Sequence, residues 1–207
     1  MIVAIDGPSA AGKGTLSRRL AAALGYHHLD TGLLYRAVGA RLLATGIDPA
    51  DAAAATRAAE GLGADDIARE GLREEHVGRA ASIVAANPGV RAALVAFQRR
   101  FAARPPGAVL DGRDIGTVIC PGAEVKLYVV ASAEVRARRR HDELLGRGEQ
   151  ATYAAVFRDL QERDARDQAR GTAPAKPAED AIVLDTTDLT ADEVFAQAIG
   201  IVRSRSS

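Results

Sequence analysis

The chain has 207 residues, enough for one domain with small attachments, and its content of 47% hydrophobic and 26% charged residues is typical of a globular protein and excludes a disordered one. Lys and Arg together number 27, as do Asp and Glu, so no excess of positive charge indicates a nucleic acid or an anionic membrane as a partner. The single cysteine, Cys120, excludes an intramolecular disulfide, and with no signal peptide or membrane span in the sequence we expect a cytoplasmic protein.

A glycine-rich segment follows the apolar run 2–5 and precedes a helical pattern over 16–24. Glycines let successive backbone N–H groups wrap a polyphosphate, a lysine adds positive charge, and the N-terminus of the next helix adds its dipole. The pattern predicts a P-loop that binds a polyphosphate, rather than an ordinary strand-to-helix turn. Its residues are Gly7, Pro8, Ser9, Ala10, Ala11, Gly12, Lys13, Gly14 and Thr15.

One position of this loop departs from the common pattern. The Ser or Thr that usually follows the lysine and ligates Mg²⁺ is replaced by Gly14, and Thr15 comes one residue later. We therefore expect Mg²⁺ to accompany ATP and to be held largely through water, with no metal site made by the protein alone.

The next elements are a helix that Gly25 ends, a short strand over 27–30 and a second helix over 33–45. Chemistry tends to collect where a strand of a parallel sheet ends. Three polar or charged side chains stand at this strand end and at the start of the helix: Thr31, Tyr35 and Arg36.

The middle of the chain shows little strand character. Residues 46–72 are rich in alanine and predict short helical pieces. Apolar residues at helical spacing then predict a helix over 74–87, a break at the sequence Asn-Pro-Gly (87–89) and a helix over 90–103.

Three further strands are predicted, over 108–110, 125–130 and 182–184. The first of them delivers the sequence Asp-Gly-Arg-Asp (111–114) at its carboxyl end, which is the edge that faces ligands in an open α/β sheet. Thr190 is expected to cap a final helix.

A helix that starts near Ser132 and runs towards Gly146 has a dense basic face. This face is either solvated or part of a mobile lid that brings arginines over phosphates, and the residues alone leave both possibilities open. Its arginines are Arg136, Arg138, Arg139 and Arg140.

A second helix is predicted over 152–170 and is expected to end at Gly171. Spacings of four and three residues place Arg163, Asp167 and Arg170 on one face of it, and Asp164 and Arg166 turn away from that face.

The alternation of strands and helices predicts an α/β fold, with a P-loop NTPase-type parallel sheet flanked by helices. One P-loop together with several separate arginines suggests two phosphorylated ligands, because arginine offers bidentate, permanently charged contacts to phosphate. Phosphoryl transfer between nucleotides has this requirement.

Six segments of the chain resemble bacterial cytidylate kinases, which are P-loop nucleoside monophosphate kinases. The segments are 7–15, 29–36, 77–85, 111–118, 131–140 and 162–170. Adenylate kinases share the Gly-Lys-Gly-Thr loop, but their Asp-Gly-Phe-Pro-Arg element is absent, and residues 111–114 stand in the comparable place.

The resemblance implies in-line transfer of the ATP γ-phosphoryl group to CMP and dCMP by an enzyme of pyrimidine nucleotide metabolism. We expect this enzyme to be a monomer. No general base is needed, because a phosphate acceptor with a second pKa of about 6 is already ionised. The alternatives are a kinase for a different nucleoside monophosphate or small phosphorylated acceptor, and a P-loop regulator that binds nucleotide without turnover.

The same resemblance implies roles for individual residues. It makes the P-loop over 7–15 the ATP-binding loop. Lys13 and the arginines Arg36, Arg113 and Arg170 would be catalytic. Three residues would read the cytosine edge: Ser82, Arg91 and Asp114. From the residues alone, Ser82 and Arg91 would be solvated positions on helix surfaces. The full set expected to bind CMP is Thr31, Tyr35, Arg36, Ser82, Arg91, Arg113, Asp114, Arg163, Asp167 and Arg170.

We expect a single nucleoside monophosphate kinase domain over 1–207, with a lid region at about 141–170 and a monophosphate-binding segment at about 46–103. The latter is too short, and too poor in alternating patterns, for the extra β-subdomain of many family members, so we expect it to be mostly helical. The core comprises 1–45, 104–140 and 181–207.

Overall fold

A five-stranded parallel sheet forms the centre of the computed structural model, which describes residues 1–169, 171 and 173–205. The strand order is β2-β3-β1-β4-β5, so β1 lies in the middle and pairs with β3 and β4. Because all pairings are parallel, the carboxyl ends of the five strands lie at one edge of the sheet, as predicted. The strands are β1 (Ile2–Asp6), β2 (His27–Asp30), β3 (Ala108–Gly112), β4 (Val125–Val130) and β5 (Ile182–Asp185).

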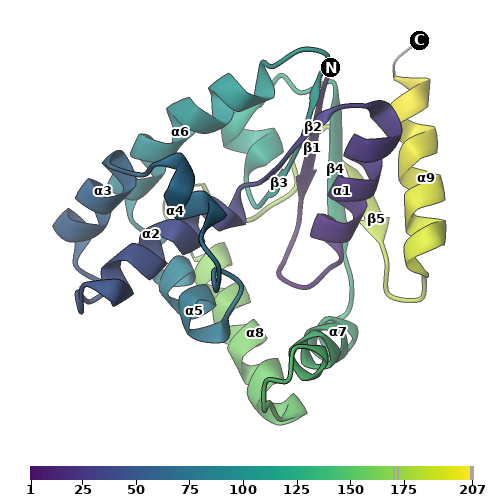
Figure 1. Cartoon of the computed structure of the whole chain (residues 1–207). Helices are drawn as coiled ribbons and strands as arrows, with labels where there is room; N and C mark the ends of the chain where they lie inside the picture. The colour runs from purple at the N-terminus through teal and green to yellow at the C-terminus, as the bar shows by residue number, and fades with distance from the viewer. Residues whose placement is uncertain (170, 172, 206–207) are drawn as a thin grey trace.

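Helices flank this sheet and extend beyond its carboxyl edge (Figure 1). They are α1 (Lys13–Leu24), α2 (Gly32–Ala44), α3 (Ala52–Glu60), α4 (Ala64–Ala68), α5 (Glu75–Val84), α6 (Pro88–Ala102), α7 (Ala133–Gly146), α8 (Tyr153–Gln168) and α9 (Ala191–Ser204). A short π-helix, η1 (Ile115–Ile119), follows β3.

The main core lies between the sheet and the pair α1 and α9. Ile5, Leu20 and Val202 are fully buried there. The other face of the sheet is covered by α6 and η1, where Leu110 and Ile119 are buried. Both faces are apolar, which explains why the central strands read as continuous hydrophobic runs.

Residues 46–103 form α3 to α6, which confirms the mostly helical segment. These helices and α2 share a second core that includes Val38, Ala55 and Val84. A Cβ atom on Gly39 would lie 2.9 Å from Cβ of Ala80, so α2 and α5 approach too closely for a larger residue at that position. Four small alanines, at 54, 55, 58 and 59, are buried in this cluster, and Tyr35 and Phe97 pack against it.

Helices α7 and α8 pack on each other at the carboxyl edge (Figure 1), through a small core of Ala137, Leu144, Val156 and Leu160. Their N-terminal caps are Ser132 and Thr152, whose hydroxyls accept backbone N–H bonds.

Several predicted boundaries are confirmed, and two are wrong. Gly25 ends α1 with a φ of 67°, and Thr190 caps α9. The break between α5 and α6, however, falls before Pro88, because the Asn87 side chain accepts the N–H of Gly89 and caps the new helix. Helix α8 ends at Gln168 rather than at Gly171.

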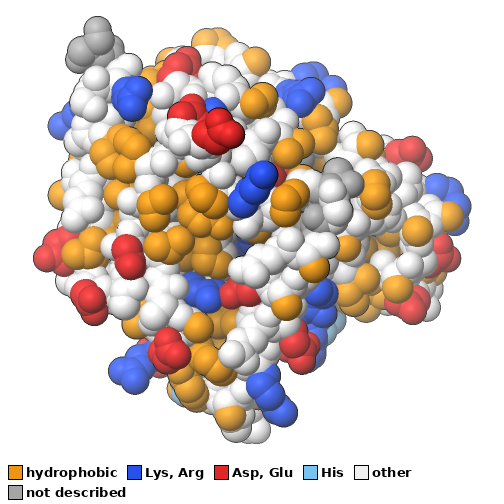
Figure 2. Space-filling model, turned by 180° about the vertical axis from the view of Figure 1, so that it is seen from behind, with side chains coloured by type: hydrophobic (Ala, Val, Ile, Leu, Met, Phe, Trp, Pro, Cys, Tyr) orange, Lys and Arg blue, Asp and Glu red, His pale blue; other side chains and the backbone are white. Residues whose placement is uncertain are grey.

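Figure 2 shows the opposite face of the molecule, where hydrophobic side chains gather near the middle and both signs of charge are interspersed around them. Val183 on β5, the strand at the end of the sheet, is 55% exposed. Among the described residues no single helix is long and apolar enough to cross a membrane, and α5 with α6 meets that length and composition only as a pair bent by 100°.

Candidate active site

The loop after β1 follows the path of a phosphate-binding loop for steric reasons. A Cβ atom on Gly7 would lie 2.0 Å from the carbonyl oxygen of Val129, so only glycine permits this contact with β4. Gly12, which precedes α1, has a φ of 95°, and Ala10 also has a positive φ of 59°. The chain therefore curls in front of the N-terminus of α1, where free N–H groups and the helix dipole favour anions.

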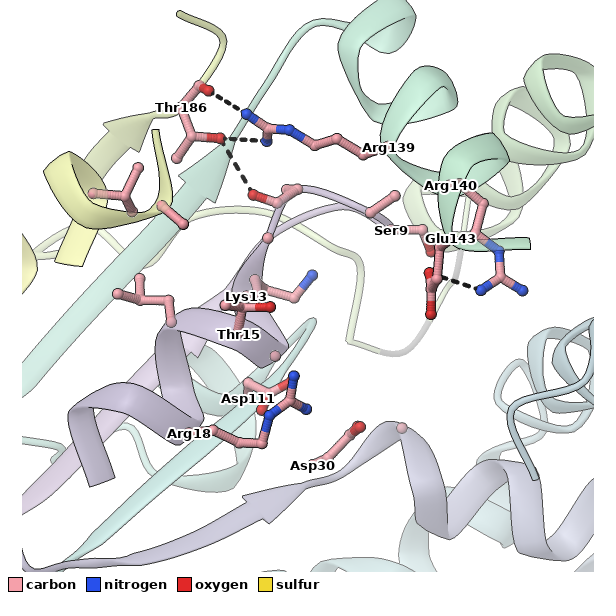
Figure 3. Close-up of a pocket in the computed structure, with 18 of the residues that line it drawn as sticks. Ser9, Lys13, Thr15, Arg18, Asp30, Asp111, Arg139, Arg140, Glu143 and Thr186 are labelled. Atoms are coloured by element: carbon pink, nitrogen blue, oxygen red, sulfur yellow. Dashed lines mark hydrogen bonds and ion pairs between the residues drawn. The ribbon is translucent and has the colours of Figure 1, made fainter. Parts of the chain in front are cut away.

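Lys13, the first residue of α1, lies inside this curl (Figure 3). Its side chain is nearly buried, and Nζ donates a hydrogen bond of 2.6 Å to the carbonyl oxygen of Pro8. Burial, followed by the charge of Arg113, lowers the pKa of Lys13 to about 7. An anionic ligand in the loop would reverse this effect by stabilising the ammonium form.

Ser9 to Thr15 line a cavity of about 580 Å³, whereas Gly7 and Pro8, which were also expected to bind ATP, do not line it. Arginines of α7 close one side of the cavity (Figure 3). Arg139 donates two hydrogen bonds to Thr186, from Nη1 to Oγ1 at 2.9 Å and from Nη2 to the carbonyl oxygen at 2.6 Å. Thr186 in turn donates to the carbonyl oxygen of Ala11 at 3.3 Å, so β5 and α7 both hold the loop.

The structure shows that most of the arginine-rich helix face is not solvated. Arg136 and Arg140 are buried, Arg138 is exposed, and Arg139 and Arg140 line the large cavity. Arg136 donates to the carbonyl oxygen of Ser9 at 3.2 Å. The basic face is therefore packed onto the loop and the cavity rather than solvated, with Arg138 as the exception.

A second, smaller cavity of about 100 Å³ lies between α2, α5, α6 and the end of β3. Arg91 forms an ion pair with Asp114, donates to the carbonyl oxygen of Ala85 at 3.2 Å and lies over the ring of Tyr35 at 5.7 Å. Ser82 and Arg91 are 7% and 5% exposed, so the alternative that they are solvated surface residues is wrong. The lining residues include Thr31, Tyr35, Ser82, Arg91 and Asp114.

The two cavities share a wall. The residues that line both are Asp30, Gly32, Arg36, Asp111, Arg113 and Arg163. Arg113 connects the two sides, because Nη2 donates to Ser9 Oγ at 2.6 Å and Nε donates to Asp167 at 2.7 Å. Two ligands, one in each cavity, would therefore approach each other at this wall.

The shared wall concentrates positive charge. Burial, with Arg163 and Arg140 as further causes, lowers the pKa of Arg36 to about 10, and burial and Arg113 lower the pKa of Arg163. Arg36 also donates to the carbonyl oxygen of Leu72 at 2.8 Å. Mutual repulsion among these guanidinium groups favours binding of a polyanion, which relieves it.

Nearly all of the predicted site residues lie around the two cavities or in the loop. Arg163 and Asp167 lie on one face of α8, as predicted, whereas Arg170 falls outside the described residues. Asp164 pairs with Arg136 at 2.8 Å, and Arg166 donates to Ser82 at 3.2 Å. The two residues that turn away from the predicted face thus still contact the surroundings of the site.

Sequence reasoning missed several contributors. Asp111 accepts a hydrogen bond from His28 at 2.8 Å and, through its backbone carbonyl, one from Thr31 at 2.7 Å. Asp30 and Asp111 line the shared wall, and their position at the ends of adjacent strands was the available signal. Thr186 and Arg139 could not have been paired from spacing, since they are far apart in sequence.

Asp6, at the end of β1, was also missed. Its carboxylate accepts the backbone N–H groups of Ile115 at 2.8 Å and Gly116 at 2.7 Å. Burial raises the pKa of Asp6 to about 6, although these two N–H donors act in the opposite direction. The contact fixes the start of η1, directly after Asp114.

Comparisons with known proteins agree with this geometry. The pattern of the cytidylate kinase family matches residues 3–204. A cytidylate kinase of Paramagnetospirillum magneticum is 61% identical over 207 residues, which cover 99% of this chain and 98% of the relative. A cytidylate kinase of Methylocella silvestris is 59% identical over 204 residues, covering 99% of this chain and 94% of the relative.

A crystal structure of an uncharacterized protein from Eubacterium ventriosum shares the fold, with a TM-score of 0.55 at 14% sequence identity and with 99% of this chain and 98% of that chain covered. The fold, the two adjoining cavities and the sequence relatives lead to one conclusion. The chain belongs to the cytidylate kinase family, whose members phosphorylate CMP.

Proposed function

We propose that the protein transfers the γ-phosphoryl group of ATP to CMP and dCMP, with ATP in the large cavity and the acceptor in the small one. The observation that carries this proposal is the shared wall of Arg36, Arg113 and Arg163, which separates the P-loop cavity from the cavity that Ser82, Arg91 and Asp114 line. Three arginines at the junction of two ligand sites match the charge that develops in phosphoryl transfer.

On the donor side, backbone N–H groups of the loop and Lys13 would hold the ATP phosphates. The protonated form of Lys13 is favoured once phosphate enters, because the negative charge offsets the burial that lowers the lysine pKa in the ligand-free site. Arg139 and Arg140 line the same cavity from α7 and would add charge over the phosphates.

Mg²⁺ would accompany ATP. The carboxylates of Asp30 and Asp111 and the hydroxyl of Thr15 line the large cavity, and oxygen donors of this kind suit a hard cation that keeps several of its waters. Among the described residues no group of three or more His, Cys, Asp or Glu side chains is arranged to hold a metal ion. When bound, the ion neutralises charge on the transferring phosphates.

On the acceptor side, Thr31, Arg36 and Arg113 would hold the CMP phosphate, together with Arg170. Arg163 and Asp167 would hold the sugar. Cytosine presents an amino donor beside ring-nitrogen and carbonyl acceptors, so the Arg91–Asp114 pair and the Ser82 hydroxyl supply complementary groups.

No general base is needed in this mechanism. The acceptor is a phosphate oxygen that is ionised near neutral pH, since its second pKa is about 6. The protein's part is to position the two phosphates in line, to neutralise charge and to exclude water. Arg140, which lines the large cavity, pairs with Glu75 at 2.6 Å and so connects α7 to α5.

An acceptor screen tests the proposal. With ATP and Mg²⁺ fixed, ADP formation is measured with CMP, dCMP, UMP, AMP and GMP at equal concentrations. CMP and dCMP should give the highest kcat/KM. A higher value with AMP, GMP or UMP would overturn the acceptor assignment, and ATP binding without ADP formation with any acceptor would favour a nucleotide-binding regulator.

A further inference from the structure

We infer that Arg166 of α8 is a positioning residue that holds the Ser82 hydroxyl towards the base of the acceptor nucleotide. Arg166 Nε donates a hydrogen bond of 3.2 Å to Ser82 Oγ, which joins α8 to α5. The inference rests on the proposed function, because it assigns Ser82 to the reading of the cytosine edge.

Ser82 lines the small cavity and is 7% exposed, whereas Arg166 is absent from the cavity wall and reaches Ser82 from outside. The ion pair of Arg91 and Asp114 contributes to the same wall. Arg166 thus acts on the base only through Ser82.

The hydrogen-bonding capacity of a hydroxyl makes this contact informative. A serine hydroxyl has one proton and two lone pairs. Serine and threonine in helices commonly donate to the carbonyl four residues earlier, as Ser17 does to Lys13 at 2.7 Å and Thr56 does to Ala52 at 2.8 Å. Within the described part of the chain, Ser82 makes no such bond and Arg166 is its partner.

Arg166 therefore occupies one lone pair of Ser82 and leaves the proton and the other lone pair for the base. Both features are required to recognise an edge that carries a donor beside acceptors, as cytosine does. Without Arg166 the hydroxyl would be free to rotate and to bond to the helix backbone instead, which would remove it from the cavity.

The neighbouring arginines have different partners. Arg113 pairs with Asp167, and Arg136 pairs with Asp164, whereas no carboxylate lies within ion-pair distance of Arg166 among the described residues. The position of Arg166 is thus not explained by a charge partner in that part of the chain. Because α8 also carries Arg163 and Asp167, one helix would link reading of the base to binding of sugar and phosphate.

A double-mutant cycle tests the inference, with Arg166→Ala, Ser82→Ala and the double variant. Arg158, an exposed arginine of α8, provides the control Arg158→Ala, which removes the same charge from the same helix. kcat/KM is measured for CMP and UMP at saturating ATP, and the melting temperature of each variant is measured without ligand.

Arg166→Ala should lower kcat/KM for CMP by about fivefold or more, through KM rather than kcat, with KM for ATP unchanged. The ratio of CMP to UMP efficiency should fall. The double variant should match Ser82→Ala, since Arg166 acts through that hydroxyl. Arg158→Ala should resemble the wild type.

Two results would overturn the inference and distinguish it from the proposed function. If Ser82→Ala lowers the CMP to UMP ratio but Arg166→Ala behaves like Arg158→Ala, Ser82 reads the base without Arg166. If losses from the two single variants simply add, Arg166 acts elsewhere. Failure of the proposed function itself would appear in the wild type, as poor use of CMP.

Discussion

Replacement of Lys13 by methionine should abolish most turnover and at the same time stabilise the ligand-free fold. The lysine is nearly buried, and burial lowers its pKa from 10.5 to about 7. This difference corresponds to about 5 kcal/mol at about 1.36 kcal/mol for each pKa unit. The protonated Lys13 side chain thus lowers the free energy of unfolding of the ligand-free enzyme. Methionine has a similar length and carries no charge.

The sign of the pH dependence follows from proton binding. Between pH 7 and 10.5 the unfolded chain binds one more proton than the folded protein at this residue, so the free energy of unfolding rises with pH. The destabilisation is complete below pH 7 and disappears near pH 10.5. The variant also loses the hydrogen bond from Nζ to the Pro8 carbonyl, which is worth about 1 kcal/mol.

At pH 7 we expect Lys13→Met to be more stable than the wild type by as much as about 3 kcal/mol, with a smaller difference at pH 9. Urea denaturation at both pH values measures this, alongside kcat with CMP and ATP. Lys176→Met, at an exposed lysine, is the matched control and should change neither stability nor turnover. A Lys13→Met variant that is less stable than the wild type at both pH values, or that keeps near-normal turnover, would refute the reasoning.

Three further substitutions test separate parts of the account. Arg113→Ala should lower kcat/KM for CMP by about 100-fold, at about 1.4 kcal/mol per tenfold, with a much smaller change in ATP affinity; an equal loss of ATP affinity by calorimetry would place Arg113 on the donor side. Arg91→Ala should lower kcat/KM for CMP by about tenfold and narrow the gap between CMP and UMP, because a buried hydrogen bond to a base edge is worth about 1–3 kcal/mol. An unchanged ratio would leave base recognition to Asp114. Asp6 has its pKa raised from 3.8 to about 6, so the folded protein binds more protons than the unfolded chain between these values and stability from this group falls as pH rises through them. The stability of the wild type relative to Asp6→Asn should therefore fall by about 2 kcal/mol between pH 4 and 7 in chemical denaturation, and a constant difference would contradict the assignment.

The fold could be predicted from the sequence because each strand and helix boundary is marked by residues close together in the chain. Apolar runs gave the central strands, and Gly25, Ser132 and Thr190 marked helix boundaries at which the structure has them. The start of α6 was misplaced because Pro88 and Gly89 read as a turn, although proline is well tolerated in the first turn of a helix.

The candidate active site could be predicted from the sequence only in part. The P-loop can be recognised from consecutive residues, whereas the burial of Ser82 and Arg91 depends on helices that pack around the end of β3. Spacing on one helix cannot reveal that Arg166 reaches Ser82, because the partner comes from another helix far away in the sequence. The resemblance to a family supplied what helical periodicity could not.

The hydrogen bonds between Asp6 and η1 show a second reason why sequence-based prediction is incomplete. A carboxylate at the end of a buried strand could serve a ligand or the backbone, and the sequence offers no means of choosing. In the structure it binds two N–H groups at the start of a π-helix, an element too rare to be predicted from a pattern.

The central claim is that two nucleotide sites meet at the wall formed by Arg36, Arg113 and Arg163. A bisubstrate compound in which adenosine and cytidine are joined through five phosphates tests it most directly. The account predicts that one molecule binds per chain and that inhibition is competitive with both ATP and CMP. Competition with ATP alone, while CMP still binds to the inhibited enzyme, would contradict it.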